Sequence, residues 1–329
     1  MASLKHVQIL DPMRGIAALA VVLFHYSGSI LPSLLPSPAK AVFSFGYLGV
    51  QVFFVISGFV IPYAMQRSGY NWHGLGRFMA RRFVRIAPPA YVAALFMIAY
   101  YYLSIFVNGH PVEGNEIPAL GARSVLANLT FLVPYLHVNW FNFVYWTLTT
   151  EFEFYLMIAL LFPLITGKSP GWRIAMVLFG LILLPFCKGP LFFHYSIYFL
   201  LGMLVFLWRE TGTDRRLLVS MFVLTSIQVV AQGGYMELCA SVIAVAIIMI
   251  APQARSPATD WLGKVSYTLY IIHAPVGYFA EAVLKHVVGP DLGTWGKLAM
   301  LCLYTGIALL LAEPFYRLVE KPFLLLSKR

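Results

Sequence analysis

The chain has 329 residues, of which 60% are hydrophobic and only 11% are charged. Soluble globular domains carry about 25% charged residues, so this composition excludes an ordinary water-soluble domain. The net charge of +10 at pH 7 suggests a nucleic-acid partner at first sight, but the positions of the cations along the chain argue against one.

Long apolar runs, separated by breakers rich in Pro and Gly, predict an all-α integral membrane protein with ten transmembrane helices. The first run has no small-residue cleavage site, so we expect no cleavable signal peptide. No internal repeat is visible, and we expect one transmembrane domain over residues 1–329. The expected helices are 11–31, 41–65, 85–107, 144–166, 172–187, 191–208, 216–233, 236–252, 265–287 and 295–319.

The Lys and Arg residues predict the orientation of these helices. With the N-terminus inside, eighteen of the 23 cations fall on inner segments or at the inner end of the first helix. The positive-inside rule then places both termini in the cytoplasm. The basic charge is therefore explained by membrane topology, and no nucleic-acid partner is expected.

One group of cations is denser than topology requires. Arg81, Arg82 and Arg85 share a helical face at the inner end of the third helix. Such a cluster either anchors the chain to anionic lipids or binds a phosphorylated ligand, because guanidinium groups pair with phosphate oxygens. The spacing alone does not separate these two interpretations.

Ionisable side chains inside predicted spans are candidates for function because their burial in a bilayer is costly. Arg14 enters the first helix, and His25 lies eleven residues later on the same face, about 16 Å further along. Glu151 lies at a depth similar to that of His25, and His273 lies near the middle of the ninth helix. A carboxylate near an imidazole favours a general base, so we expect His25 and Glu151 to converge.

Less specific interpretations exist for several of these residues. A lone intramembrane histidine can be a packing residue, and Glu153 faces the opposite flank of the helix from Glu151. The three cysteines lie in or beside apolar runs without metal-ligand spacing, so we expect buried small hydrophobic residues and no metal site. These cysteines are Cys187, Cys239 and Cys302.

Six segments together resemble the acyltransferase family 3 proteins, in the family's order and over most of the chain. They are "LDPMRGIAALAVVLFHY", "GYLGVQVFFVISGFVI", "RRFVRIAPPAY", "WTLTTEFEFYL", "LGKVSYTLYIIHAPV" and "YRLVEKPF". The resemblance implies a membrane enzyme of ten or eleven spans. Its expected reaction moves an acyl group, mostly acetyl, from coenzyme A to a carbohydrate outside the cytoplasm.

The resemblance also implies roles for individual residues. The family's Arg–His pattern falls on Arg14 and His25, and its two spaced arginines fall on Arg82 and Arg85. The other motif positions fall on Ser57 and Gly58, Trp146 and Glu151, Tyr267, Tyr270 and His273, and Glu320 and Pro322.

The sequence departs from the family pattern at a few positions. The usual Asp-Gly before the arginine is Asp11-Pro12, the frequent acid after "GV" is Gln51, and the usual serine after the tryptophan is Thr147. These changes put only peripheral contacts in doubt. The SGNH esterase-like domain often found in the family is absent from this sequence, so we expect transfer to take place within the membrane domain.

These observations predict an O-acyltransferase that uses acetyl-CoA and sits in the inner or plasma membrane of a bacterium. The arginines Arg14, Arg81, Arg82 and Arg85 would bind the coenzyme A phosphates. His25 would act as general base or carry the acyl group itself, and Glu151 would orient and stabilise its ring.

The carbohydrate acceptor is expected to contact aromatic residues at the outer end of the fourth helix. Tyr145 and Trp146 offer aromatic faces for a sugar ring, and His273 is a further candidate for substrate contact. The Ser57 hydroxyl would support the carbonyl of the thioester, although Ser57-Gly58 is equally suited to packing. The alternative function is a proton-coupled transporter that uses the same histidines and glutamate as a relay. Inverted repeats would favour that alternative, and none is visible.

Overall fold

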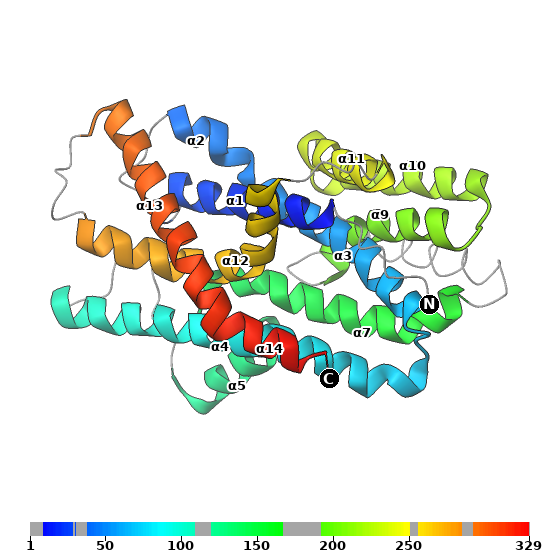
Figure 1. Ribbon diagram of the computed structural model, residues 1–329, viewed down its shortest axis with the longest axis horizontal. Helices are drawn as coiled ribbons and strands as arrows, with labels where there is room; N and C mark the ends of the chain where they lie inside the picture. The colour runs from blue at the N-terminus through cyan, green and yellow to red at the C-terminus, as the bar shows by residue number, and fades with distance from the viewer. Residues whose placement is uncertain are drawn as a thin grey trace. The chain divides into compact units, whose positions relative to one another are not determined.

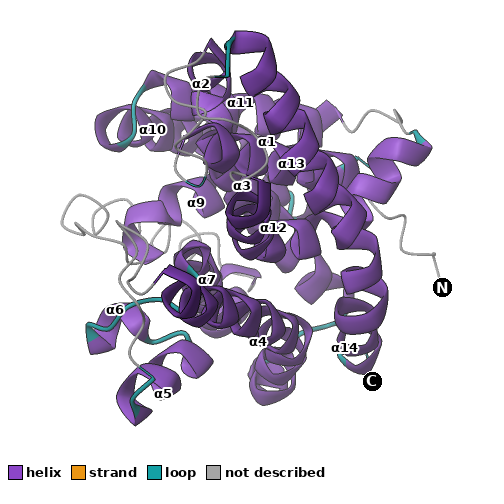
Figure 2. Ribbon diagram, turned by 90° about the vertical axis from the view of Figure 1, so that its left-hand side faces the viewer, coloured by secondary structure: helices purple, strands orange, loops and turns teal. Residues whose placement is uncertain are grey.

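The computed structural model describes residues 9–28, 30, 38–108, 120–166, 192–250, 256–284 and 292–328. Within these ranges every regular element is helical (Figures 1 and 2). The α-helices are α1 (Leu10–Gly28), α2 (Pro38–Phe43), α3 (Leu48–Arg67), α4 (Leu75–Asn108), α5 (Ala122–Thr130), α6 (Val133–Leu136), α7 (Trp146–Thr166), α9 (Phe192–Glu210), α10 (Arg215–Gln232), α11 (Tyr235–Ile250), α12 (Pro257–Leu284), α13 (Thr294–Phe315) and α14 (Lys321–Leu326). Short 3₁₀ turns cover Ser44–Tyr47, Trp72–Gly74 and Phe143–Tyr145, and a π-helical turn covers Tyr316–Glu320.

Each expected helix has a counterpart, except 172–187, which lies outside the described residues. Two helices begin eight or more residues earlier than expected. α4 starts at Leu75, so that the helix extends past the arginine cluster on its N-terminal side. α12 starts at Pro257, where Ser256 Oγ accepts a hydrogen bond from the Thr259 N–H and thereby caps the first turn.

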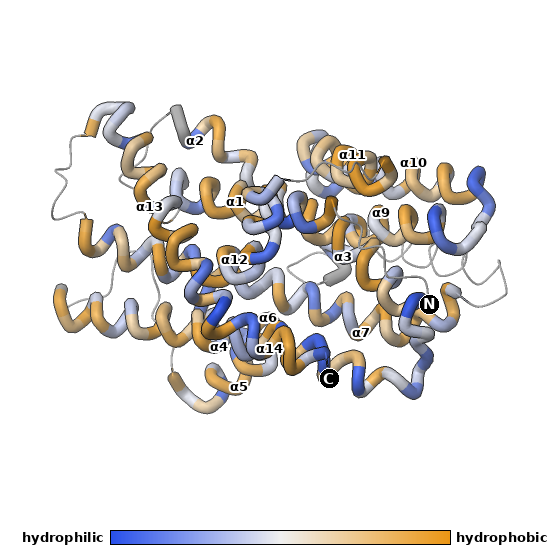
Figure 3. The backbone as a smooth tube through the Cα atoms, viewed as in Figure 1, coloured by the Kyte–Doolittle hydropathy of each residue, from blue (hydrophilic) through white to orange (hydrophobic). Residues whose placement is uncertain are grey.

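Four helical stretches in the described part of the chain are long and apolar enough to cross a membrane. They are Lys40–Arg67, Trp72–Val107, Phe143–Thr166 and Thr294–Leu326. The residues between helices are more hydrophilic. Figure 3 shows hydrophilic residues where α9 ends and α10 begins. Arg209 and Glu210 end α9, Asp214 lies in the turn, and Arg215 and Arg216 begin α10.

The chain divides into two compact units, each assembled from distant segments. The first unit comprises residues 1–17, 48–79 and 150–264. Its centre is the pair α3 and α9, which run side by side (Figure 1). A Cβ atom added at Gly58 would lie 2.0 Å from the Phe199 carbonyl oxygen, and one added at Gly202 would lie 2.0 Å from that of Val55. The absence of side chains at both glycines therefore allows the two helix backbones to touch.

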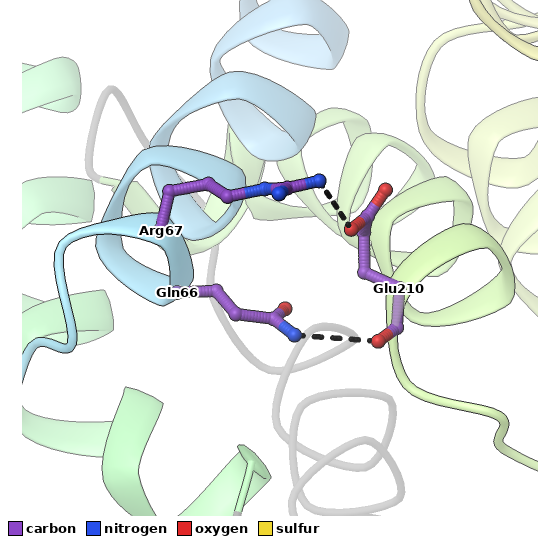
Figure 4. Close-up of polar contacts among 3 residues, drawn as sticks. All are labelled: Gln66, Arg67 and Glu210. Atoms are coloured by element: carbon purple, nitrogen blue, oxygen red, sulfur yellow. Dashed lines mark hydrogen bonds and ion pairs between the residues drawn. The ribbon is translucent and has the colours of Figure 1, made fainter. Parts of the chain in front are cut away.

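Polar contacts join the ends of these two helices. Arg67 Nη2 lies 3.6 Å from Glu210 Oε2, and Gln66 Nε2 donates to the Glu210 carbonyl at 3.3 Å (Figure 4). The Arg67 side chain is 48% exposed, so the ion pair contributes at most about 1 kcal/mol. The packing of the apolar faces, and not this pair, holds α3 against α9.

The second unit comprises residues 18–47, 80–149 and 265–329. In it α12 contacts α1 on one side and α4 on the other (Figure 1). Tyr267 Oη donates to the Ile86 carbonyl at 2.6 Å, and Tyr145 Oη donates to the Ala90 carbonyl at 2.5 Å. These carbonyls flank Pro88 and Pro89, whose missing N–H groups interrupt the hydrogen bonds of α4. The tyrosines thus bond to α4 on either side of its two prolines.

Candidate active site

The most notable polar contact in the second unit joins two histidines that are 248 residues apart. His25 Nδ1 on α1 lies 3.0 Å from His273 Nε2 on α12. The rings are stacked, with centroids 5.0 Å apart and planes inclined by 21°. His273 is completely buried, whereas His25 is partly exposed. Of the two imidazoles, His25 is thus the one that a substrate can reach.

Hydrogen bonds fix His273 and the neighbouring turn of α12. Tyr26 Oη donates to the His273 carbonyl at 2.7 Å, and His273 Nδ1 lies 2.6 Å from the Tyr270 carbonyl oxygen. Tyr270 Oη in turn lies 2.7 Å from Thr147 Oγ1 and donates to the Val144 carbonyl at 3.1 Å. Helices α1, α12 and the start of α7 are thereby connected around the ring.

Aromatic rings surround His25. Phe24 and Phe143 meet it edge to face, with ring centroids 5.0 and 5.3 Å from that of His25. These contacts restrict the rotation of the imidazole and exclude water from its flanks. The site therefore presents a held, partly accessible ring nitrogen in an apolar setting, as a general base or an acyl-accepting nucleophile requires.

The carboxylate of Glu151 belongs to the first unit, near the start of α7. Tyr155 Oη donates a hydrogen bond to Glu151 Oε1, and Ser57 Oγ on α3 donates to the same oxygen at 3.5 Å. The two hydroxyls fix the direction of the carboxylate. Sequence reasoning did not include Tyr155, although its position one helical turn after Glu151 was a usable signal.

The expected convergence of His25 and Glu151 stays a prediction, because the two residues belong to different compact units. Within its own unit, each of the two side chains is held by hydrogen bonds, Glu151 by Tyr155 and Ser57. The observed partner of His25 within its own unit is His273.

The arginines of the candidate donor site fall on two helices. Arg81, Arg82 and Arg85 follow one another along α4, with Arg81 exposed and the other two partly buried. Arg85 also interacts electrostatically with Tyr316, in the π-helical turn. Arg14 lies in α1 and is partly buried. The grouping of Arg14 with the α4 arginines stays a prediction, as does their role in binding phosphate.

The aromatic pair proposed to contact the acceptor differs in accessibility. Tyr145 is 2% exposed and its hydroxyl is bonded to Ala90, whereas Trp146 is partly exposed at the first residue of α7. Of the two rings, Trp146 offers the accessible face. Their contact with a sugar stays a prediction.

The last matched segment, "YRLVEKPF", contributes a buried hydrogen bond to the second unit. Glu320 is 5% exposed and accepts a hydrogen bond from Thr268 Oγ1 at 2.5 Å. It lies in the π-helical turn, directly before Lys321-Pro322, where proline removes a backbone donor. The motif thus ties the end of the chain to α12, close to His273 in sequence.

Two further expectations concern cysteines and metals. Cys239 and Cys302 are free and exposed, so the expectation that they are buried is wrong for both. They lie on helix faces that other parts of the described chain do not cover. Cys187 lies outside the described residues. In the part of the chain that the structure describes, no cluster of three or more His, Cys, Asp or Glu residues has metal-binding geometry.

Known proteins provide an independent comparison. A family model described as an acyltransferase domain matches residues 7–317. The O-acetyltransferase OatA of Staphylococcus aureus is 23% identical, over 98% of this chain and 58% of its own length. The peptidoglycan O-acetyltransferase OatA of Listeria monocytogenes is 27% identical, over 47% of this chain and 24% of its own length.

A third relative is similar in length to the chain. The putative acetyltransferase ORF330 of Acidianus two-tailed virus is 24% identical, over 79% of this chain and 80% of its own length. The chain spans less than two thirds of the length of the two OatA proteins. No solved structure matches the chain.

Proposed function

The chain belongs to the acyltransferase domain family, and on this premise we propose that it transfers an acetyl group from acetyl-CoA to a carbohydrate hydroxyl. The names of the relatives, which are O-acetyltransferases, support this reaction class. The observation that carries the proposal is the His25 imidazole, which is partly exposed, flanked by aromatic rings and held by a hydrogen bond to a buried partner.

In the proposed reaction His25 takes the proton of the acceptor hydroxyl. The oxygen attacks the carbonyl carbon of the thioester, a C–O bond forms and the C–S bond breaks. The coenzyme A sulfur then takes the proton from the imidazolium and leaves as a thiol. The alternative is an acyl-histidine intermediate. In it the ring nitrogen attacks the thioester carbonyl and displaces coenzyme A, and the acceptor hydroxyl then attacks the acyl group and displaces the imidazole.

Glu151 is proposed to stabilise the positive charge that develops on His25. A carboxylate held by Tyr155 and Ser57 is oriented before the reaction, so its contribution needs little reorganisation. Trp146 is proposed to stack on a sugar ring of the acceptor. The acceptor would be a polysaccharide or a lipid-linked carbohydrate.

The donor is proposed to bind through its phosphates. Arg82 and Arg85 are one turn apart on α4 and partly buried. Partial burial favours binding of a phosphorylated ligand over anchoring to lipid headgroups at the membrane surface. Arg81 and Arg14 complete the proposed phosphate site. The neutral arm of coenzyme A would then extend toward His25.

We propose that residues 1–329 form one transmembrane domain with ten spans and both termini in the cytoplasm of a bacterial cell. This orientation puts the arginine cluster on the side where acetyl-CoA is made. Single cysteines introduced at Arg123 and at Gly74, in a background without the native cysteines, test it. An impermeant thiol reagent added outside intact cells should label position 123 and leave position 74 unlabelled. Labelling at position 74 would reverse the orientation.

The proposed activity is tested by supplying radiolabelled acetyl-CoA to membranes that contain the chain and to matched membranes that lack it. The label should enter the carbohydrate fraction only in the first case, and alkali should release it as acetate, as expected of an ester. Equal incorporation in both membranes would contradict the proposal. Replacing acetyl-CoA with a longer acyl-CoA in the same assay identifies the preferred acyl group.

A further inference from the structure

We infer that His273 is a positioning residue that fixes the tautomer of His25, so that the proton of the neutral ring is on Nδ1 and the lone pair is on Nε2. The inference rests on the proposed role of His25 as base. It gives His273 a task different from contact with the acceptor. The argument follows the hydrogen bonds from the buried end of the pair to the exposed end.

The buried end is the contact between His273 and its own helix. His273 Nδ1 lies 2.6 Å from the Tyr270 carbonyl oxygen. A carbonyl oxygen only accepts, so Nδ1 must carry the hydrogen. In a neutral ring the lone pair is then on Nε2.

The contact between the rings then determines the tautomer of His25. The nitrogen that faces His273 Nε2, at 3.0 Å, is His25 Nδ1. Because Nε2 of His273 is an acceptor, Nδ1 of His25 must donate. This contact therefore selects the His25 tautomer with the lone pair on Nε2.

The packing of α1 against α12 keeps the two rings in register. Tyr26, the residue after His25, donates from its hydroxyl to the His273 carbonyl at 2.7 Å. A Cβ atom added at Gly277, one turn after His273, would lie only 2.6 Å from Tyr26 Cε1. A side chain at this position would thus push α12 away from α1. The glycine permits the approach that the histidine contact needs.

This arrangement gives His273 the orienting role that an aspartate has in a Ser-His-Asp triad. After His25 takes a proton at Nε2, its Nδ1–H still donates to the same acceptor. The ring therefore does not have to turn during the reaction. Glu151 is then left to stabilise the charge on His25 and is not needed to select its tautomer.

The test combines two substitutions at His273 with a spectroscopic measurement. His273→Leu removes the acceptor and replaces the imidazole with an apolar side chain of similar size, whereas His273→Gln provides an oxygen that can accept from His25. Nitrogen NMR of protein labelled with ¹⁵N-histidine distinguishes the nitrogen that carries hydrogen from the one that carries the lone pair. The His25 signals are assigned by their loss in His25→Ala, and His194→Leu, at a histidine in the other unit, is the control.

We expect the wild-type protein to show hydrogen on His25 Nδ1. In His273→Leu this signal should move toward the other tautomer, and kcat should fall by ~10² or more while KM for acetyl-CoA stays near its wild-type value. His273→Gln should recover part of the Nδ1–H signal and part of kcat. Gly277→Ala is the second variant, and it should weaken the same signal with His273 still present.

An Nε2–H tautomer in the wild-type protein would overturn the inference. So would a normal kcat and an unchanged His25 spectrum in a His273→Leu protein that binds coenzyme A. Failure of the proposed function has a different signature, because His25→Ala would then transfer acetyl normally whatever the NMR spectrum shows. If His273→Leu does not fold, the spectra of His273→Gln and Gly277→Ala decide the question.

Discussion

Replacing Tyr155 with phenylalanine removes one hydroxyl from the first unit and keeps the aromatic ring, which packs against Phe78 and Phe154. The lost group is the donor of a hydrogen bond to Glu151. A hydrogen bond to a charged group contributes about 1.5–3 kcal/mol. If the orientation of the carboxylate matters fully in the transition state, this energy corresponds to a roughly 10- to 150-fold loss of kcat.

Two comparisons make the expectation specific. Glu151→Gln keeps an oxygen that can accept from Tyr155 but removes the charge, so kcat should fall further in Glu151→Gln than in Tyr155→Phe. Ser57→Ala removes a contact of 3.5 Å, which is at the limit of hydrogen bonding, and should cost less than tenfold. Steady-state kinetics with acetyl-CoA in detergent or nanodiscs measures all three variants. A Tyr155→Phe enzyme with normal kcat, or one less active than Glu151→Gln, would refute the reasoning.

Two further predictions concern donor binding and helix packing. Arg82→Ala and Arg85→Ala should each weaken coenzyme A binding by about 1–3 kcal/mol, as measured by calorimetry, because a charge-assisted phosphate contact is lost. Arg317→Ala, which removes the exposed ion pair with Glu313, is the control. Equal coenzyme A affinity in all three variants would favour the alternative that the α4 arginines anchor the chain to anionic lipids. Gly58→Ala should lower stability to thermal unfolding by about 1–3 kcal/mol, since its Cβ would meet the backbone of α9. Gly306→Ala is the control and should not lower the stability, because an added Cβ at Gly306 meets no atom within 4 Å. A Gly58→Ala protein as stable as the wild type would contradict the close packing of α3 and α9.

The helices could be predicted well because long apolar runs have few alternatives in a bilayer. The early starts of α4 and α12 were missed for a physical reason. Charged residues such as Arg77 and Asp260 interrupt the apolar pattern without interrupting the helix, so hydropathy underestimates helix length. The short helices α5 and α6 were missed because each is too short for a span.

The sequence singles out candidate site residues but not their contacts. His25 and His273 stand out as candidates because ionisable groups in apolar runs are rare. Their contact joins residues 248 positions apart, and no spacing rule reaches that far. The same limit applies to Thr268 and Glu320, and to Tyr26, whose part in holding His273 depends on the packing of α1 against α12.

The central claim, that His25 is the base of an acyl transfer from coenzyme A, is tested most directly by His25→Ala in purified protein. Transfer of labelled acetyl to the acceptor and binding of coenzyme A are measured on the same sample. The account predicts that transfer falls by ~10²–10⁴ or below detection, since a positioned base contributes that much, while coenzyme A binds with near-normal affinity. Normal turnover in His25→Ala would contradict the account.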